Sequence, residues 1–168
     1  MSQINVNEWV PATGTTSTIT AATVTFAATT VNANATTINA SGTLALADNI
    51  VSAPKFKDYS EVVNAIGSTG GGTQDFDLTL GNTATATVDT SANTFTFSNP
   101  PATGTAGTLT LILTNGASQT VNWPASVDWP GGTAPTLTAS GIDILTFLTI
   151  DAGTIWYGFA SGIGMASP

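Results

Sequence analysis

Carboxylates are the most numerous ionisable side chains of this chain, with ten Asp and Glu against two lysines. Asp75 and Asp77 alternate along one expected strand, so they share a face and could hold a hard cation such as Ca²⁺. No loop of spaced Asp and Asn ligands surrounds them, which favours two solvated carboxylates. Glycoside hydrolysis needs two carboxylates flanking the scissile bond, and three more aspartates have the right type: Asp128, Asp143 and Asp151. Nothing in their spacing selects a pair, so the sequence predicts no catalytic site and no enzyme.

Aromatic residues in the C-terminal part form the second candidate site. The set comprises Trp123, Trp129, Trp156 and Tyr157. Flat rings stack on sugar faces, so this set could bind a glycan. Aromatic side chains more often fill cores and subunit contacts. The sequence therefore favours a packing role, with glycan binding as the alternative.

Two missing residue types exclude several classes of function. Without His or Cys, the chain has no imidazole base, no thiol nucleophile and no zinc site of the usual ligands. Its net charge is -8, and Lys55 and Lys57 are too few cations to neutralise a nucleic-acid backbone. No apolar run reaches the roughly 18 residues of a membrane span. We therefore expect no cofactor, no metal, no nucleic-acid partner and no membrane partner.

Four segments must position these residues. They are an N-terminal anchoring arm (1–14), a Thr/Asn-rich stem (15–53), a helix with a Gly-rich linker (54–73) and a C-terminal β domain (74–168). The arm carries three apolar anchors that could attach the protein to a larger assembly: Ile4, Val6 and Trp9. Trp9 could equally pack on its own domain.

The stem repeats weakly at seven-residue intervals. The repeated units are Thr23-Val24-Thr25, Thr30-Val31-Asn32 and Thr37-Ile38-Asn39. A coiled coil would need two apolar positions per heptad, whereas β-branched residues favour strands. The repeat therefore predicts a short, intertwined β-solenoid-like stem. One chain has too few rungs to bury a core, so we expect three chains around one axis, with Val24, Val31 and Ile38 between them.

Residues 54–67 are predicted to form the one short helix. Their apolar side chains recur at helical spacing and comprise Phe56, Tyr59, Val62, Val63 and Ile66. Gly67 and the glycines after it would end the helix. A lone helix with so apolar a stripe needs a partner. We expect this stripe to join the trimer interface.

Period-2 alternation predicts an all-β C-terminal domain. Strands are expected at Asp75–Leu80, Thr83–Val88, Thr94–Ser98, Thr108–Leu113, Thr120–Trp123, Ile142–Ile150 and Thr154–Phe159. Short strands at this spacing are typical of an antiparallel β-sandwich of the jelly-roll kind. The expected core rows are Leu109, Leu111 and Leu113 on one strand and Ile142, Ile144, Thr146 and Leu148 on another.

The same segment carries an ordered set of motifs. They are Asn93-Thr-Phe-Thr-Phe-Ser-Asn-Pro-Pro101, Leu109-Thr-Leu-Ile-Leu113, Gln119-Thr-Val-Asn-Trp-Pro124 and Val127-Asp-Trp-Pro-Gly-Gly132. In this order the segment resembles a β domain of tailed-bacteriophage virion proteins, found at the ends of trimeric fibres and in surface decorations. The two Trp-Pro blocks are its most specific part. The resemblance implies no catalytic residue, and the chain lacks a long shaft and a sizeable tail-attachment domain.

Together these expectations describe a homotrimeric, mainly β virion structural protein. We expect a capsid decoration or cement protein, a short head fibre whose arm grips the shell and whose β knob projects outward. The alternative is a short tail fibre or spike tip that binds host surface glycans; a bacterial adhesin and a monomeric sandwich are weaker options. Expected partners are further copies of the chain, the phage major capsid protein or tail proteins, and, in the alternative, a host glycan. The first residues lack a secretory leader, which suggests synthesis in a host cytoplasm and a final place on the virion surface.

Overall fold

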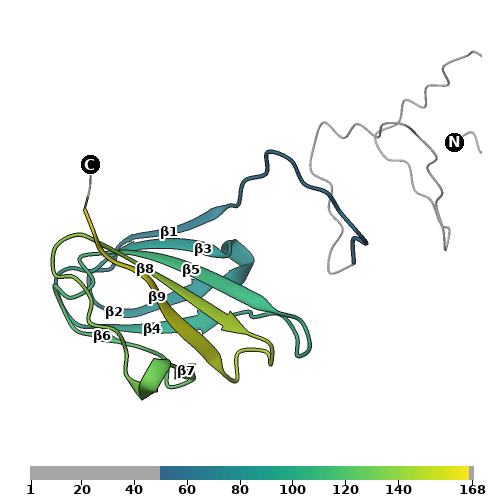
Figure 1. Ribbon diagram of the computed structural model, residues 1–168. Helices are drawn as coiled ribbons and strands as arrows, with labels where there is room; N and C mark the ends of the chain where they lie inside the picture. Colours follow the sequence, from purple (N-terminus) through teal and green to yellow (C-terminus); the bar gives the residue numbers. More distant parts are fainter. Residues whose placement is uncertain (1–49, 167–168) are drawn as a thin grey trace, which may run out of the picture. The chain divides into compact units, whose positions relative to one another are not determined.

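The computed structural model describes residues 50–166, and every strand in this range lies in the second of the chain's two units, Pro54–Pro168 (Figure 1). Within the described residues the only helical elements are two short 3₁₀ turns, η1 (Leu78–Leu80) and η2 (Pro130–Gly132). The expected mainly β class is confirmed. The arm and stem residues predicted to make contacts lie outside the described residues: Ile4, Val6, Trp9, Val24, Val31 and Ile38.

Nine strands form two sheets. In chain order they are β1 (Val63–Ser68), β2 (Gly72–Asp77), β3 (Thr83–Thr87), β4 (Asn93–Ser98), β5 (Gly107–Thr114), β6 (Val121–Asn122), β7 (Val127–Asp128), β8 (Ile142–Thr149) and β9 (Trp156–Met165). The larger sheet has the order β1-β3-β5-β8-β9-β7, and the smaller has the order β2-β4-β6. Each of the seven strands expected after residue 74 overlaps an observed strand.

The first six strands alternate between the two sheets as the chain advances. β1, β3 and β5 pair in parallel in the larger sheet, while β2, β4 and β6 pair in parallel in the smaller one. Each successive pair of strands therefore makes one turn of a short coil, a winding typical of β-helices. β8 and β9 then return beside β5 as antiparallel neighbours.

The expectation of an antiparallel domain is therefore wrong for most of the strand pairs. Only the β5–β8 and β8–β9 ladders of the described strands are antiparallel. Short turns between alternating strands suggested hairpins, but the connections from β1 to β7 carry the chain from one sheet to the other. Asn99, with φ of 53°, lies just after β4 in such a connection. Asn tolerates this left-handed conformation better than most residues do.

The helix predicted over 54–67 is also wrong. Residues 54–62 adopt no regular structure, and Val63–Ser68 forms β1, paired in parallel with β3 from Val63↔Thr83 onward. β-branched side chains lose χ1 freedom in a helix and pack well in a strand. The open edge of β3 supplies the backbone hydrogen bonds that β1 needs. The β domain thus begins inside the segment predicted as helix and linker.

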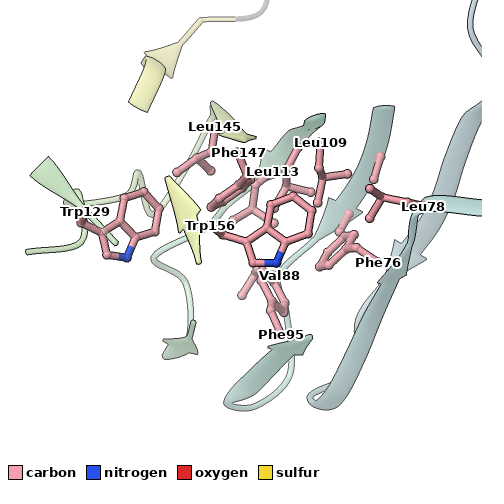
Figure 2. Packing of buried hydrophobic residues seen from close by; sticks show 13 residues of the cluster. Phe76, Leu78, Val88, Phe95, Leu109, Leu113, Trp129, Leu145, Phe147 and Trp156 are labelled. Carbon is pink, nitrogen blue, oxygen red and sulfur yellow. The ribbon is translucent and has the colours of Figure 1, made fainter. Parts of the chain in front are cut away.

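One hydrophobic core receives side chains from both sheets (Figure 2). β2 and β4 of the smaller sheet contribute Phe76 and Phe95, which are fully buried. β5 contributes Leu109, Leu111 and Leu113, as expected from the sequence. Phe97 of β4 connects the sheets, since its ring lies 4.8 Å from that of Phe147 on β8.

The second expected core row lies on the wrong face of β8. The buried residues of this strand are Asp143, Leu145, Phe147 and Thr149. The expected row is only half-buried and comprises Ile142, Ile144, Thr146 and Leu148. Register explains the difference, because Leu109 and Leu111 of β5 pair with Phe147 and Leu145 of β8. Residues paired across a ladder share a face, so the inward row of β5 fixes that of β8.

Candidate functional site

The two aspartates of β2 act as hydrogen-bond acceptors for a neighbouring strand and turn. On β2, the Asp75 carboxylate accepts hydrogen bonds from Thr96 Oγ1 at 2.7 Å and Ser98 Oγ at 2.6 Å. Asp77 caps η1 by accepting from the Thr79 backbone N–H at 2.8 Å. Both carboxylates therefore bind donors of their own chain. Within residues 50–166 no group of three or more acidic, His or Cys side chains could hold a metal ion.

Local hydrogen bonds lower the pKa of three partly exposed aspartates. The side chains of Asn99 and Thr79 hold the pKa of Asp77 below its ordinary value. Ser68 Oγ and the Gly70 N–H do the same for the pKa of Asp89, which ties β3 to the β1–β2 turn. In the β8–β9 turn, the Ile155 N–H is the main cause of the lowered pKa of Asp151.

Acidification is expected to destabilise the domain through these three aspartates. Their folded-state pKa values lie below the ordinary value of 3.8, so as the pH falls past that value the unfolded chain binds protons first. Their stabilisation is complete above about pH 5 and is lost as pH falls through the ordinary value and then the lowered pKa values. Thermal unfolding followed by circular dichroism should give a midpoint that is flat above this range and falls below it.

The matched pair for this measurement is Asp89→Asn and Asp58→Asn. Asp58 precedes the first strand, so its replacement removes a carboxylate without touching the β1–β2 turn. Asp89→Asn should lower the midpoint at neutral pH and flatten its acid dependence. An identical pH profile for the two variants would show that the Asp89 hydrogen bonds contribute nothing.

The three aspartates with the chemical type of glycosidase residues occupy three different settings. Asp143 is fully buried on the inward face of β8, where its carboxylate accepts from the Thr138 and Gly164 N–H groups at 2.7 and 3.0 Å. Asp151 caps the β8–β9 turn, and Asp128 is exposed on β7. Asp143 and Asp151 thus serve as acceptors for backbone donors, and no hydrogen bond joins any two of the three.

Three of the four predicted aromatic residues belong to the core. Trp156 is 1% exposed and Trp129 is 8% exposed. Trp123 is half-buried, with its ring 5.3 Å from that of Trp129 and 5.4 Å from that of Phe95. These edge-on packings are typical of aromatic clusters. The indoles therefore join the two sheets, which is the packing role favoured by the sequence, and leave no flat platform of three rings.

Gly158 allows one of these indoles to lie against β9. A Cβ atom at this position would come within 2.8 Å of Trp129 Cζ3 and 2.9 Å of Val127 Cγ1. Only glycine permits such a close approach between a strand backbone and a side chain. This local requirement positions the Trp129-Pro130 block beside the strand that carries Trp156 and Tyr157.

Tyr157, the fourth predicted aromatic residue, is 39% exposed on the opposite face of β9 from Trp156. Two open pockets lie on either side of Asp128, and only the first includes Tyr157 in its lining. One is lined by Asp128, Trp129, Pro130, Tyr157, Gly158 and Phe159, and the other by Ala125, Ser126, Val127, Asp128, Thr154 and Ile155. The structure thus brings Tyr157 together with Asp128, a carboxylate considered in the sequence only as a hydrolytic group. The short strand β7 that places Asp128 there was not predicted.

The apolar residues predicted to line a trimer interface divide into two groups. Phe56, Tyr59 and Val62 are each more than 70% exposed and precede the first strand. Val63 is 48% exposed on β1, whereas Ile66 packs against the core. Because these residues do not form one helical stripe, they do not support the trimer interface that was expected from such a stripe.

Comparisons with known proteins give no relative: no protein-family model, curated protein or solved structure matches the chain. Among residues 50–166 there is no helix with the length and apolar character needed to cross a bilayer.

Proposed function

We propose that the protein is a structural component of a tailed-bacteriophage virion, a homotrimeric capsid decoration or cement protein. In this proposal the N-terminal arm holds the shell, and the β domain projects from the virion surface as a sandwich-like knob. The protein is not an enzyme and needs no cofactor. The first support for the proposal is the resemblance between the motifs of residues 74–168 and the β domains of such virion proteins.

The observation that carries this proposal is the structural role of the tryptophan and aspartate side chains. The indoles of Trp123, Trp129 and Trp156 pack into the core that joins the two sheets. Most of the described aspartates accept hydrogen bonds from turns and neighbouring strands. Side chains that stabilise the fold in this way are expected in a structural surface component. The net charge of -8 would keep neighbouring copies apart on a crowded shell.

Attachment is assigned to the arm because its apolar anchors lie close together in the sequence. Ile4, Val6 and Trp9 could lie as an extended strand along an exposed sheet edge of a shell protein. Each such side chain yields roughly 1.5–3 kcal/mol when it is fully buried. Three arms on one trimer would combine weak contacts into firm attachment.

Deletion of residues 1–10 tests this function. The shortened chain should remain soluble and folded, with the circular dichroism spectrum of the full chain, and should no longer co-purify with virions. The matched control replaces residues 1–10 with a Gly/Ser segment of equal length, which should also fail to attach. A shortened chain that still decorates heads would place the attachment elsewhere.

A short tail fibre or spike tip that binds host surface glycans is the second candidate function. The specific observation in its favour is the open pocket that Tyr157, 39% exposed, lines together with Asp128. In glycan-binding sites, aromatic rings commonly stack on sugar rings, and carboxylates commonly accept hydrogen bonds from sugar hydroxyls. The two functions differ in their place and abundance on the particle.

A further inference from the structure

An uncharged, apolar surface covers the outer side of two neighbouring strands. We name it the β8–β9 face and define it by six residues: Ile142, Ile144 and Leu148 of β8, and Tyr157, Phe159 and Met165 of β9. Ladder pairing places them on one side, since Leu148 pairs with Tyr157 and Ile142 pairs with Met165. The inward side of the same strands carries buried residues such as Leu145 and Trp156.

Both faces of these two strands are therefore mainly apolar. The polar residues on the outer side are Thr146 and Ser161, whose hydroxyls are hydrogen-bonded to each other at 2.7 Å. The three β9 residues of the face are 39–49% exposed, which leaves large side chains in water. Elsewhere on the same side of the sheet, the outward positions are mostly threonine: Thr83, Thr85, Thr108, Thr110 and Thr114. Strands that are apolar on both faces are typical of sheets covered on both faces. The change from threonine to Ile, Leu, Tyr and Phe marks the part of the sheet that needs a cover.

The distribution of charge favours a second copy of the chain as the cover of this face. The chain carries ten carboxylates and a net charge of -8, yet the only charged residue on either strand is the buried Asp143, so the outer side of β8 and β9 carries no charge. Of the aspartates nearby, Asp143 points into the core, and Asp128 on β7 lies beside Tyr157 at the rim. By contrast, β2 of the other sheet carries Asp75 and Asp77. Two copies of this acidic chain can thus approach through the β8–β9 face without bringing carboxylates into its centre.

We propose that the β8–β9 face is a contact surface between copies of this chain, so that the β domain itself contributes to self-association. The inference rests on the homotrimer of the proposed function and names a surface for it. It moves the expected contact from the residues before the first strand to the outer side of β8 and β9. A glycan stacked on Tyr157 would compete for the same surface.

The test compares two charge insertions in the full-length chain. Phe159→Glu places a carboxylate at the centre of the β8–β9 face, and Thr94→Glu places one on β4 at an exposed position of the other sheet. Sedimentation equilibrium over a dilution series should show that Phe159→Glu raises the dissociation constant between copies at least about tenfold. Thr94→Glu should leave it unchanged. Circular dichroism confirms that each variant is folded.

A second readout covers the case in which other residues also hold the copies together. The natural chain has no cysteine, so a cross-link reports only on an introduced thiol. A short bis-maleimide should link copies of Phe159→Cys but not copies of Thr94→Cys. If Phe159→Glu associates like the natural chain and Phe159→Cys gives no cross-link, the proposed surface is wrong while the homotrimer stands.

The remaining outcomes separate this inference from the proposed function. A natural chain that is monomeric at every concentration overturns the surface and the homotrimer, whereas co-purification with virions tests the structural role independently. Loss of virion binding by Phe159→Glu, with no change in self-association, would assign the β8–β9 face to another virion protein. Loss of glycan binding alone would assign it to a sugar. Each of these results overturns the contact between copies.

Discussion

Replacing Phe147 with alanine is expected to lower the free energy of unfolding by about 3–5 kcal/mol, the usual cost of removing a buried aromatic side chain. Phe147 is fully buried on the inward face of β8. Its ring lies 4.8 Å from that of Phe97 and 5.6 Å from those of Trp123 and Trp129. The substitution would leave a cavity where the two sheets meet, and the surrounding rings are too rigid to fill it.

The matched control is the next residue along the same strand. Leu148 points to the outer side of β8 and is only half-buried, so Leu148→Ala should cost about 1 kcal/mol, well below a fully buried leucine. Urea denaturation followed by tryptophan fluorescence measures both, at a concentration where the two variants have the same quaternary state. Equal losses for the two variants would contradict the assigned face of β8.

Asp143→Ala is expected to lower the free energy of unfolding by about 2–4 kcal/mol. The Asp143 carboxylate is fully buried and accepts the N–H groups of Thr138 and Gly164. Without it, both donors lose their partner, and each unsatisfied buried donor costs about 1–3 kcal/mol. Two such donors would together cost about 2–6 kcal/mol. We expect the lower part of this combined range because Gly164 lies near the surface, where water can reach it.

Asp143→Asn distinguishes this hydrogen-bonding role from simple packing. Asparagine has nearly the same volume but keeps one acceptor oxygen and directs an NH₂ group toward the other donor. Asp143→Asn should therefore lower the free energy of unfolding by less than Asp143→Ala does. It should also increase hydrogen exchange at Thr138 or Gly164. Natural stability in Asp143→Ala would mean that these backbone groups do not depend on the carboxylate.

Sequence alone located most strands but could not assign their partners. Period-2 alternation with flanking turn residues is a local signal, and each of the seven strands that it predicted overlaps an observed strand. Parallel or antiparallel pairing depends on where the chain goes after each turn. The connection that contains Asn99-Pro100 has the composition of a hairpin turn, yet it lies between strands of two different sheets. The coiled winding of β1 to β6 was therefore beyond local reasoning.

Two other errors arose where one pattern fits two structures. Phe56, Tyr59, Val62, Val63 and Ile66 satisfy helical spacing, but the β-branched residues among them also suit a strand. The vacant edge of β3 then decided in favour of β1. β8 is apolar on both faces, so alternation could not tell the row of Ile144 from that of Leu145. Register with β5 made that choice.

The candidate site was predicted in part. The packing role of Trp123, Trp129 and Trp156 could be favoured because aromatic side chains more often fill cores, and Tyr157 was included in the aromatic set. Asp143 could not have been identified as a core acceptor, because Gly164, one of its two donors, is distant in the sequence. Asp151 carried a usable signal, since Asp151-Ala-Gly-Thr154 has the composition of an Asx turn.

Quantification of the protein in purified virions, combined with imaging of its position, tests the proposed function most directly. Mass spectrometry gives its ratio to the major capsid protein, and an antibody against the β domain shows where it lies on the particle. We expect a ratio close to that of the shell subunit and label over the whole head. Absence from the particles would contradict a virion role, and a low ratio with label confined to the tail would contradict decoration in favour of the tail fibre.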